Sequence, residues 1–465
     1  MKRTRQTVAV LSTVALAGAL AACGSSDSQS GEAGGSTELK ITTNAIAGGK
    51  NAAQAEWIEE WVIPNFEKMK ADAGAPVKVI FEAQGVDDED YKTKLALDLQ
   101  SGGGADIIGI DGIWTGEFAE AQYIKPLEEV AADSANWDGW QQIPEAVQQA
   151  LSFEGKVYGV PQGADGRVLY YNKDLFKEAG LPEDWQPKSW DDVLDAGRAL
   201  KALDGVTPIQ LNAGTAMGEA TTMQGVLPML AGTGELIWED GQWMGDTSGL
   251  RDVLNLYKTI YVDEGLGDPI LQQEAAGRDN SFQMFADKQI GILLEGDYFW
   301  RSVINPEEGV GTAPMADRDT EVGYTLIPAM KSGEGVFGQD YVSMSGGAGR
   351  VLNPNSKNPD LAWELLAFMN SPEAIEAQAA GTLTISARDD VNKKLLSSDP
   401  MLTWVSENVL PITAYRPGLA EYPQVSTALQ QATLDVVTGG DVESAASTYL
   451  STLEGVVGAD SVRSS

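Results

Sequence analysis

Residues 105–112 read ADIIGIDG, a short apolar run that ends in an Asp–Gly pair. A run of this length and composition predicts a buried strand over residues 105–110. The Asp–Gly pair then places Asp111 at the carboxyl end of that strand, where its side chain is free to meet a ligand.

The segments around this strand alternate between strand and helix patterns. Residues 39–43 and 77–82 predict strands, and apolar residues spaced four apart between 91 and 99 predict a helix. Ser189 has the sequence context of a helix N-cap. Alternating strands and helices predict an α/β fold with parallel sheets, whose ligands bind beyond the carboxyl ends of the strands. Asp111 occupies such a position.

The N-terminus has the pattern of an export signal. Residues 1–22 combine a basic start with an uncharged, mostly apolar run, too short for a spanning helix. The tetrad Leu-Ala-Ala-Cys at residues 20–23 resembles the lipobox of bacterial lipoproteins, in which the cysteine receives a lipid. This resemblance implies lipidation of Cys23 and anchoring at the outer face of the cell membrane. An ordinary signal peptide with a bystander cysteine is the alternative.

The segment after this cysteine predicts a flexible linker. Residues 24–37 read GSSDSQSGEAGGST, which offers almost nothing to bury. We therefore assign residues 1–22 to the signal peptide and residues 23–37 to a lipid-anchored linker. The folded body begins at about residue 38.

Composition excludes several classes of function. The chain has 32 Lys and Arg against 68 Asp and Glu, a net charge of −36, which repels nucleic acid and anionic lipid headgroups. It has no histidine and a single cysteine, which excludes Ser-His-Asp and Cys-His catalysis and the usual zinc ligand sets. We expect neither a metal site nor a cofactor. A pair of carboxylates is the remaining route to an enzyme.

Aromatic residues are the feature most suggestive of a ligand. The chain has 12 Trp and 13 Tyr, and Trp114, Tyr298 and Trp300 lie beside polar or glycine-rich turns. A pyranose binds through an apolar face on an aromatic plane and through hydroxyls that meet polar groups at its edge. The alternative is that tryptophans belong to the core. We predict that role for four on apolar helix faces: Trp57, Trp61, Trp190 and Trp363.

Residues 154–175 read EGKVYGVPQGADGRVLYYNKDL and resemble a segment of carbohydrate-binding proteins of ABC importers, the maltose-binding-protein type. Residues 105–127, 285–300 and 358–377 resemble further segments of this solute-binding family in the same order. The resemblance spans roughly residues 38 to 455. It implies an exported protein that binds a sugar and delivers it to a membrane permease, without enzymatic activity.

The resemblance also implies site residues. Asp165 aligns with an acid that faces the sugar, and Tyr298 aligns with the first Trp of the family motif N-G-P-W. Asp111 and Trp114 align with cleft residues, and Arg416 resembles a sugar-contacting arginine. The remaining residues that we assign to the ligand site are Trp300, Asn44, Asp340, Tyr341 and Tyr415.

Two departures from the family pattern bear on the ligand. The N-G-P-W motif is Glu-Gly-Asp-Tyr at residues 295–298, and no tryptophan occurs among residues 425–431. Both departures argue against a long linear maltodextrin. They leave a disaccharide or another small glycan.

The implied fold is a two-lobed periplasmic-binding-protein-like α/β fold of type II, with a hinge and a ligand cleft between the lobes. The expected N-terminal lobe comprises residues 38–163 plus about 340–385. The expected C-terminal lobe comprises residues 164–339 plus about 386–460. The hinge stretches would be residues 161–166, 337–347 and 379–387, and the protein would act as a monomer.

Two other functions remain open from the sequence. A binder of a non-sugar solute, such as a polyamine or a peptide, is compatible with the negative charge. A glycoside hydrolase would need two carboxylates about 5–9.5 Å apart, for which Asp111 and Asp165 are the candidates.

Overall fold

Strand β3 (Ile107–Asp111) is the middle strand of a five-stranded sheet with the order β2-β1-β3-β15-β6. The structure is a computed structural model that describes residues 37–49, 51–86, 88–308, 310–380 and 383–464. β1 (Thr37–Thr43) pairs in parallel with β2 (Val77–Ala83) and with β3. The three strands that the sequence predicted here are therefore confirmed, with ends that differ by one or two residues.

The other half of this sheet is not parallel. β15 (Ala348–Leu352) pairs antiparallel with β3 and with β6 (Gly159–Pro161). The prediction of purely parallel sheets is therefore wrong. β15 follows β14 (Tyr341–Ser345), a strand of a different sheet, and only Gly346 and Gly347 lie between the two strands. This connection contains no helix, so it is not a strand–helix–strand unit.

A second sheet has the order β12-β7-β11-β8. β11 (Ile290–Gly296) runs parallel to β8 (Thr207–Gln210) and antiparallel to β7 (Arg167–Asn172), which also pairs antiparallel with β12 (Val322–Thr325). Smaller sheets and a hairpin use β4 (Ser152–Phe153), β5 (Lys156–Val157), β9 (Trp238–Glu239), β10 (Gln242–Met244), β13 (Ile327–Pro328), β14, β16 (Thr413–Tyr415) and β17 (Val462–Arg463).

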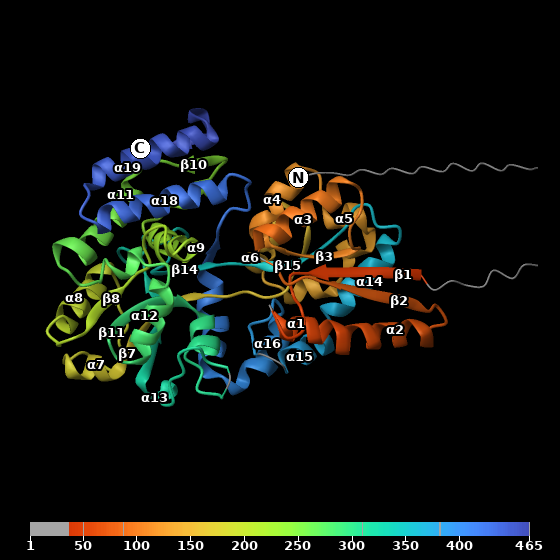
Figure 1. The fold of residues 1–465 in the computed structure, drawn as a ribbon, viewed down its shortest axis with the longest axis horizontal. Coiled ribbons are helices and arrows are strands. Elements are labelled where there is room, and N and C mark those ends of the chain that lie inside the picture. Colours follow the sequence, from red (N-terminus) through yellow and green to blue (C-terminus); the bar gives the residue numbers. More distant parts are fainter. Residues whose placement is uncertain (1–36, 50, 87, 309, 381–382, 465) are drawn as a thin grey trace, which may run out of the picture. The chain divides into compact units, whose positions relative to one another are not determined.

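Helices cover both large sheets (Figure 1). The α-helices of the described residues are α1 (Ala52–Glu56), α2 (Ile63–Asp72), α3 (Asp88–Gln100), α4 (Thr115–Glu120), α5 (Leu127–Val130), α6 (Glu145–Gln148), α7 (Lys173–Glu178), α8 (Trp190–Leu200), α9 (Glu219–Thr221), α10 (Leu227–Gly232), α11 (Ser248–Lys258), α12 (Gly277–Ala286), α13 (Arg318–Glu321), α14 (Pro359–Met369), α15 (Pro372–Ala379), α16 (Asp389–Leu395), α17 (Pro400–Trp404), α18 (Tyr422–Val437) and α19 (Val442–Val457). The hydroxyl of Ser189 accepts a hydrogen bond from the Asp192 amide at 3.3 Å, so the predicted N-cap of α8 is confirmed.

Strand periodicity divides the core. Along β7, Val168 and Tyr170 belong to one hydrophobic cluster, whereas Leu169 and Tyr171 belong to another on the opposite face of the sheet. This follows because successive side chains of a strand point to opposite faces. The predicted core tryptophans Trp57, Trp190 and Trp363 are buried, and Trp61 stacks on Phe368 with ring centroids 5.5 Å apart.

The chain crosses between sheets at two places: residues 162–166 lead from β6 to β7 of the second large sheet, and Gly346–Gly347 lead from β14 of the smaller sheet β13-β14-β16 to β15. The first crossing is held by a β-bridge between Gly163 and Ser386. A Cβ at Gly163 would approach the Ile385 carbonyl oxygen to 2.6 Å, so this contact requires a glycine. The crossings coincide with two of the predicted hinge stretches, and all residues from Thr37 onward belong to one compact unit.

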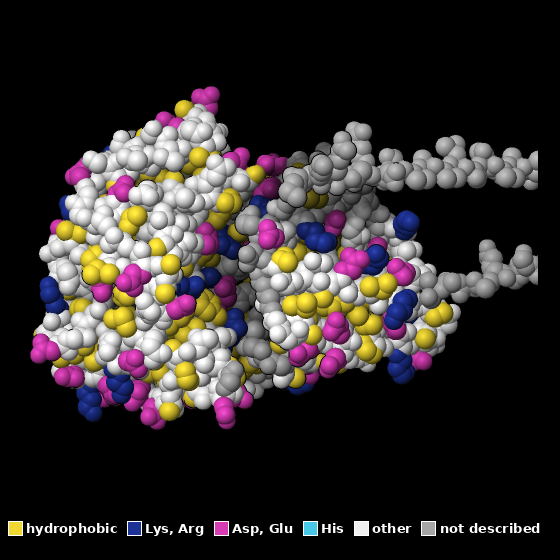
Figure 2. Space-filling model, viewed as in Figure 1, with side chains coloured by type: hydrophobic (Ala, Val, Ile, Leu, Met, Phe, Trp, Pro, Cys, Tyr) yellow, Lys and Arg dark blue, Asp and Glu magenta, His cyan; other side chains and the backbone are white. Residues whose placement is uncertain are grey.

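The predicted signal peptide and Cys23 lie outside the described residues. Within the described ranges, no helix has both the length and the apolar character needed to cross a bilayer. Figure 2 shows carboxylate side chains spread over the viewed face, as the net charge of −36 requires.

Candidate ligand-binding site

Asp165 lies where the two crossings meet. Its carboxylate oxygen Oδ1 accepts hydrogen bonds from the Gly346 amide at 2.8 Å and from the Ser345 hydroxyl at 3.0 Å. It also forms an ion pair with Nη1 of Arg167 at 2.7 Å. Burial raises the pKa of Asp165, but Arg167, Gly346 and Ser345 together outweigh it and hold the pKa below its usual range. Asp165 is therefore ionised and held in a fixed position.

Arg416 connects the end of β3 to helix α9. Its Nη2 atom lies 3.2 Å from Oδ1 of Asp111 at the end of β3, and its Nη1 atom lies 2.8 Å from Oε1 of Glu219 in α9. Glu219 is fixed in turn by hydrogen bonds at 2.6 Å from Tyr422 and from Ser426. Burial raises the pKa of Asp111, and the charge of Arg416 opposes this rise. A guanidinium held by two carboxylates has a defined orientation.

These charged groups converge beside Gly346. A Cβ built at this glycine would lie 3.6 Å from Oδ1 of Asp165, 3.8 Å from Nη2 of Arg416 and 3.9 Å from Nη2 of Arg167. A larger residue would occupy the space between an acceptor and two donors. The glycine therefore keeps this space open.

The convergence opens into a cavity of about 670 Å³, which we call the polar cavity. Its walls come from the start of α1, from both crossings and from the segment before α16; among them are Gln54, Asp111, Gln162, Asp165, Arg167, Arg301, Gln378, Ser386 and Arg416. Its volume suits a small ligand. None of its described lining residues is aromatic, and charged and amide side chains share its walls with small residues such as alanine and glycine.

The charges of the polar cavity are compensated. Each guanidinium contacts at least one carboxylate: Arg167 with Asp165 at 2.7 Å, Arg301 with Asp297 at 3.1 Å, and Arg416 with Asp111 at 3.2 Å. Such pairs present donors and acceptors side by side without a large net charge. This arrangement favours a neutral polar ligand over a strongly charged one.

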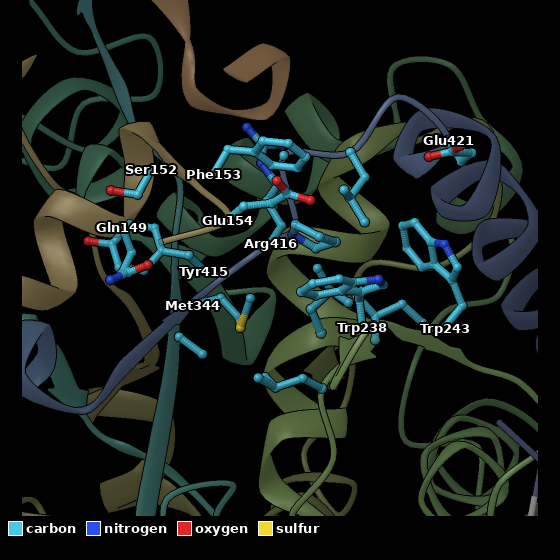
Figure 3. Close-up of a pocket in the computed structure, with 18 of the residues that line it drawn as sticks. Gln149, Ser152, Phe153, Glu154, Trp238, Trp243, Met344, Tyr415, Arg416 and Glu421 are labelled. Atoms are coloured by element: carbon cyan, nitrogen blue, oxygen red, sulfur yellow. The ribbon is translucent and has the colours of Figure 1, made fainter. Parts of the chain in front are cut away.

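A second cavity of about 750 Å³, the aromatic cavity, shares the Arg416 side chain with the first. Figure 3 shows Phe153, Trp238, Trp243 and Tyr415 around it. Burial raises the pKa of Tyr415 to about 12, although a hydrogen bond with Ser345 opposes this shift. Tyr415 is thus the predicted site residue that lines the aromatic cavity, and Arg416 lines both cavities.

The predicted aromatic platform at residues 298–300 lines neither cavity. The Tyr298 hydroxyl donates to the Glu295 carboxylate, and it accepts from Arg278 and from Nε2 of Gln224, the latter at 3.0 Å. Trp300 is 4% exposed, and its indole donates to Asp399 at 3.2 Å. Trp300 is therefore a core residue.

Two residues predicted for the cleft have structural roles. Trp114 is 5% exposed and packs between Tyr91 and Phe118, because the turn after β3 folds its ring back onto α3. Asn44 is buried, and its side-chain amide donates to the Val86 carbonyl at 2.9 Å. It fixes the turn between β2 and α3 and lines neither cavity.

The predicted pair at the start of β14 is absent from both cavity walls. Asp340 is exposed and accepts a hydrogen bond from the Ser332 hydroxyl at 2.6 Å. Tyr341 is half-buried at the first position of the strand. Neither residue lines a cavity described here.

Sequence reasoning missed the partners of the predicted charges. Arg167 could have been found, because it is a charged residue at the start of an otherwise apolar strand pattern, RVLYYN. Glu219 and Arg301 carry no such signal, since each lies in a helical segment with other polar residues nearby. Over the part of the chain that the structure describes, no group of acidic or cysteine side chains is arranged to hold a metal ion.

Two sheets joined by crossings, with a polar cavity at the crossings, define a two-lobed α/β ligand-binding protein. The family model of the bacterial extracellular solute-binding protein matches residues 48–376, and the chain belongs to this family. A maltooligosaccharide ABC transporter solute-binding lipoprotein of Streptococcus pneumoniae (strain ATCC BAA-255 / R6) is 24% identical over 447 residues, which cover 93% of each chain.

Solved structures agree on the fold. An ABC transporter solute-binding protein from Thermotoga lettingae TMO, bound with alpha-D-tagatose, has a TM-score of 0.66 at 24% identity and covers 90% of this chain and 100% of its own. A cyclic alpha-maltosyl-1,6-maltose binding protein from Arthrobacter globiformis has a TM-score of 0.69 at 21% identity and covers 91% and 100%. The fold implied by the sequence resemblance is thereby confirmed.

Proposed function

We propose that this protein binds a small neutral sugar in the polar cavity and delivers it to the permease of an ABC importer. The observation that carries this proposal is the convergence of Asp165, Arg167 and Arg416 around the open space at Gly346. A sugar hydroxyl donates one hydrogen bond and accepts others. An acceptor flanked by two donors is the complementary arrangement.

The compensated charges select against other solutes. A polyamine would place ammonium groups beside Arg167, Arg301 and Arg416, and a polyanion would meet Asp111 and Asp165. Repulsion between like charges inside the cavity disfavours the binding of either solute. Asp111, Asp165 and Arg416 are therefore the direct ligand contacts in this proposal.

The relatives support the same ligand class. Their names specify maltooligosaccharide, alpha-D-tagatose and cyclic alpha-maltosyl-1,6-maltose, which are all sugars. The relative that spans 93% of this chain is also named as a lipoprotein. It supports lipidation of Cys23 and a location at the outer face of the membrane.

We assign the N-terminal lobe to residues 38–163 plus about 340–385 and the C-terminal lobe to residues 164–339 plus about 386–460. The crossings at residues 162–166 and at Gly346–Gly347 act as the hinge. A sugar that contacts Asp111 in one lobe and Arg416 in the other favours the closed state, because it binds that state more tightly. The monomer releases the sugar to the permease unaltered.

A saccharide panel tests this proposal. Mono- to tetrasaccharides are screened by thermal shift on the mature chain, where a ligand at 100 times its Kd adds about 2.7 kcal/mol of stability. Calorimetry on Arg416→Met and on the exposed control Lys201→Met then locates the site. We expect lost affinity in the first variant alone. Failure of every saccharide to stabilise the protein refutes sugar binding. Release of reducing ends indicates hydrolysis and refutes binding for transport without enzymatic activity.

A further inference from the structure

The aromatic cavity has walls of a different chemistry from those of the polar cavity. It is lined by Phe153 of β4, Trp238 of β9, Trp243 of β10 and Tyr415 at the end of β16, together with Phe337. Trp238 is 36% exposed and Phe337 is 64% exposed, so large apolar surfaces remain open to solvent. Exposed aromatic rings gathered around one cavity mark a binding site rather than ordinary surface.

Three carboxylates lie at this cavity. Glu120 ends α4, Glu154 occupies the β4–β5 turn and Glu421 precedes α18, and each lines the cavity. Burial raises the pKa of Glu120, and the charges of Glu421 and Glu154 raise it further, so both of these carboxylates lie within electrostatic reach of Glu120. The lining therefore carries an excess of negative charge.

The arginine that lines this cavity already pairs with carboxylates that do not line it. Arg416 is the one Lys or Arg among the described residues that line the cavity, and its guanidinium contacts Asp111 and Glu219. It does not neutralise Glu120, Glu154 or Glu421. Aromatic faces beside uncompensated carboxylates attract a cation, through the ring quadrupoles and through direct charge.

We propose that the aromatic cavity is a second binding site, which takes a small organic cation with an ammonium group next to an apolar body. The apolar body packs on Trp238 and Phe153, and the ammonium group points toward Glu120 and Glu154. This ligand class differs from the neutral sugar, because the aromatic cavity lacks the paired donors and acceptors of the polar cavity. The inference does not depend on the sugar proposal.

Calorimetric titration of the mature chain with 2-phenylethylammonium tests this site, and 2-phenylethanol is the neutral probe of matched shape. We expect the ammonium probe to bind at least tenfold more tightly than the alcohol. We also expect its affinity to fall as sodium chloride is raised, since exposed charge pairs are screened. This comparison uses the wild-type chain, so it does not depend on the folding of any variant.

Two double variants locate the binding. Glu120→Gln with Glu154→Gln removes two charges at the cavity, whereas Glu178→Gln with Glu183→Gln removes two exposed charges at and beyond the end of α7. We expect at least a fivefold loss of ammonium affinity in the first pair and less than a twofold change in the second. Equal binding of both probes, equal effects of the two double variants, or loss of ammonium binding only in Asp165→Asn overturns the proposal.

Discussion

Replacement of Asp165 by Asn separates the two roles that the structure gives this carboxylate. The amide keeps an oxygen that can accept from the Gly346 amide and the Ser345 hydroxyl, but it loses the charge opposite Arg167. The Arg167 side chain is only 6% exposed, and its Nε atom has no hydrogen-bond partner. The substitution therefore removes the carboxylate that pairs directly with a buried guanidinium.

The expected loss of stability follows from this geometry. Removal of one partner from a buried ion pair costs about 3–5 kcal/mol. Asp165 is 26% exposed at its side chain, and the Asn oxygen retains its acceptor role, so we expect about 2–3 kcal/mol here. With an unfolding entropy of about 2.1 cal/mol/K per residue, that loss lowers the Tm of a protein of this size by roughly 2–3 °C.

Sugar affinity should fall in the same variant. A hydrogen bond to a charged group contributes about 1.5–3 kcal/mol, which corresponds to a roughly 10- to 100-fold change in Kd. Urea unfolding measures the first effect and calorimetry with the sugar found by the panel measures the second. Asp204→Asn, at an exposed position, is the control for loss of one negative charge.

The stability effect has a defined dependence on pH. Because the pKa of Asp165 is lowered in the folded protein, its ionised form contributes stability above the unfolded pKa of about 4. That contribution is lost as the pH falls through the folded pKa. The difference in the free energy of unfolding between wild type and Asp165→Asn, the stability gap, should thus be constant from about pH 5 to 8 and shrink below about pH 4. A gap that grows in acid, or a Kd that does not change, refutes the reasoning.

Four further predictions follow from individual side chains. Arg350 is 1% exposed, burial lowers its pKa to about 9, and its Nε and Nη2 atoms lack hydrogen-bond partners. Arg350→Met should therefore raise the free energy of unfolding by about 1–3 kcal/mol in urea unfolding, despite the loss of a cation–π contact to Trp57. A lower urea midpoint in the variant contradicts this. Arg416→Met should weaken sugar binding at least tenfold by calorimetry, since it removes the guanidinium that pairs with Asp111 at the end of β3 and with Glu219 in α9. Trp300→Ala should cost about 3–5 kcal/mol of stability and leave the sugar Kd unchanged, as expected for a core deletion; a changed Kd would instead place this ring at the ligand. Cys23→Ser should abolish labelling by radioactive palmitate, and equal labelling of mutant and wild type would exclude lipidation at this residue.

Local features of the fold were predictable from the sequence. The apolar run before Asp111 forms β3, and Ser189 caps α8. Of the four tryptophans on apolar helix faces, Trp57, Trp190 and Trp363 are buried, and the partly buried Trp61 packs against the core. Each of these features depends on a window of a few residues, within which side-chain periodicity and capping chemistry act directly.

The antiparallel half of the first sheet could not be predicted in this way. The sequence of β15 has the apolar character of any buried strand, and its direction depends on the route by which the chain arrives through Gly346 and Gly347. The orientation of the Trp114 ring in the turn after β3 could not be predicted from the sequence either. Whether Trp114 faces a ligand or the core depends on where α3 packs, and Tyr91 of that helix receives the ring.

By itself, the sequence determined the alternation of strands and helices, the net charge of −36, and the acidic and basic residues available for a ligand. The tertiary structure alone decided which of them meet. Asp111 and Arg416 are 305 positions apart in the chain, and Asp165 meets Gly346 across 181. Local propensity carries no information about such pairs, because their contact is set by the path of the chain through the two crossings and by the packing of the sheets that those crossings join.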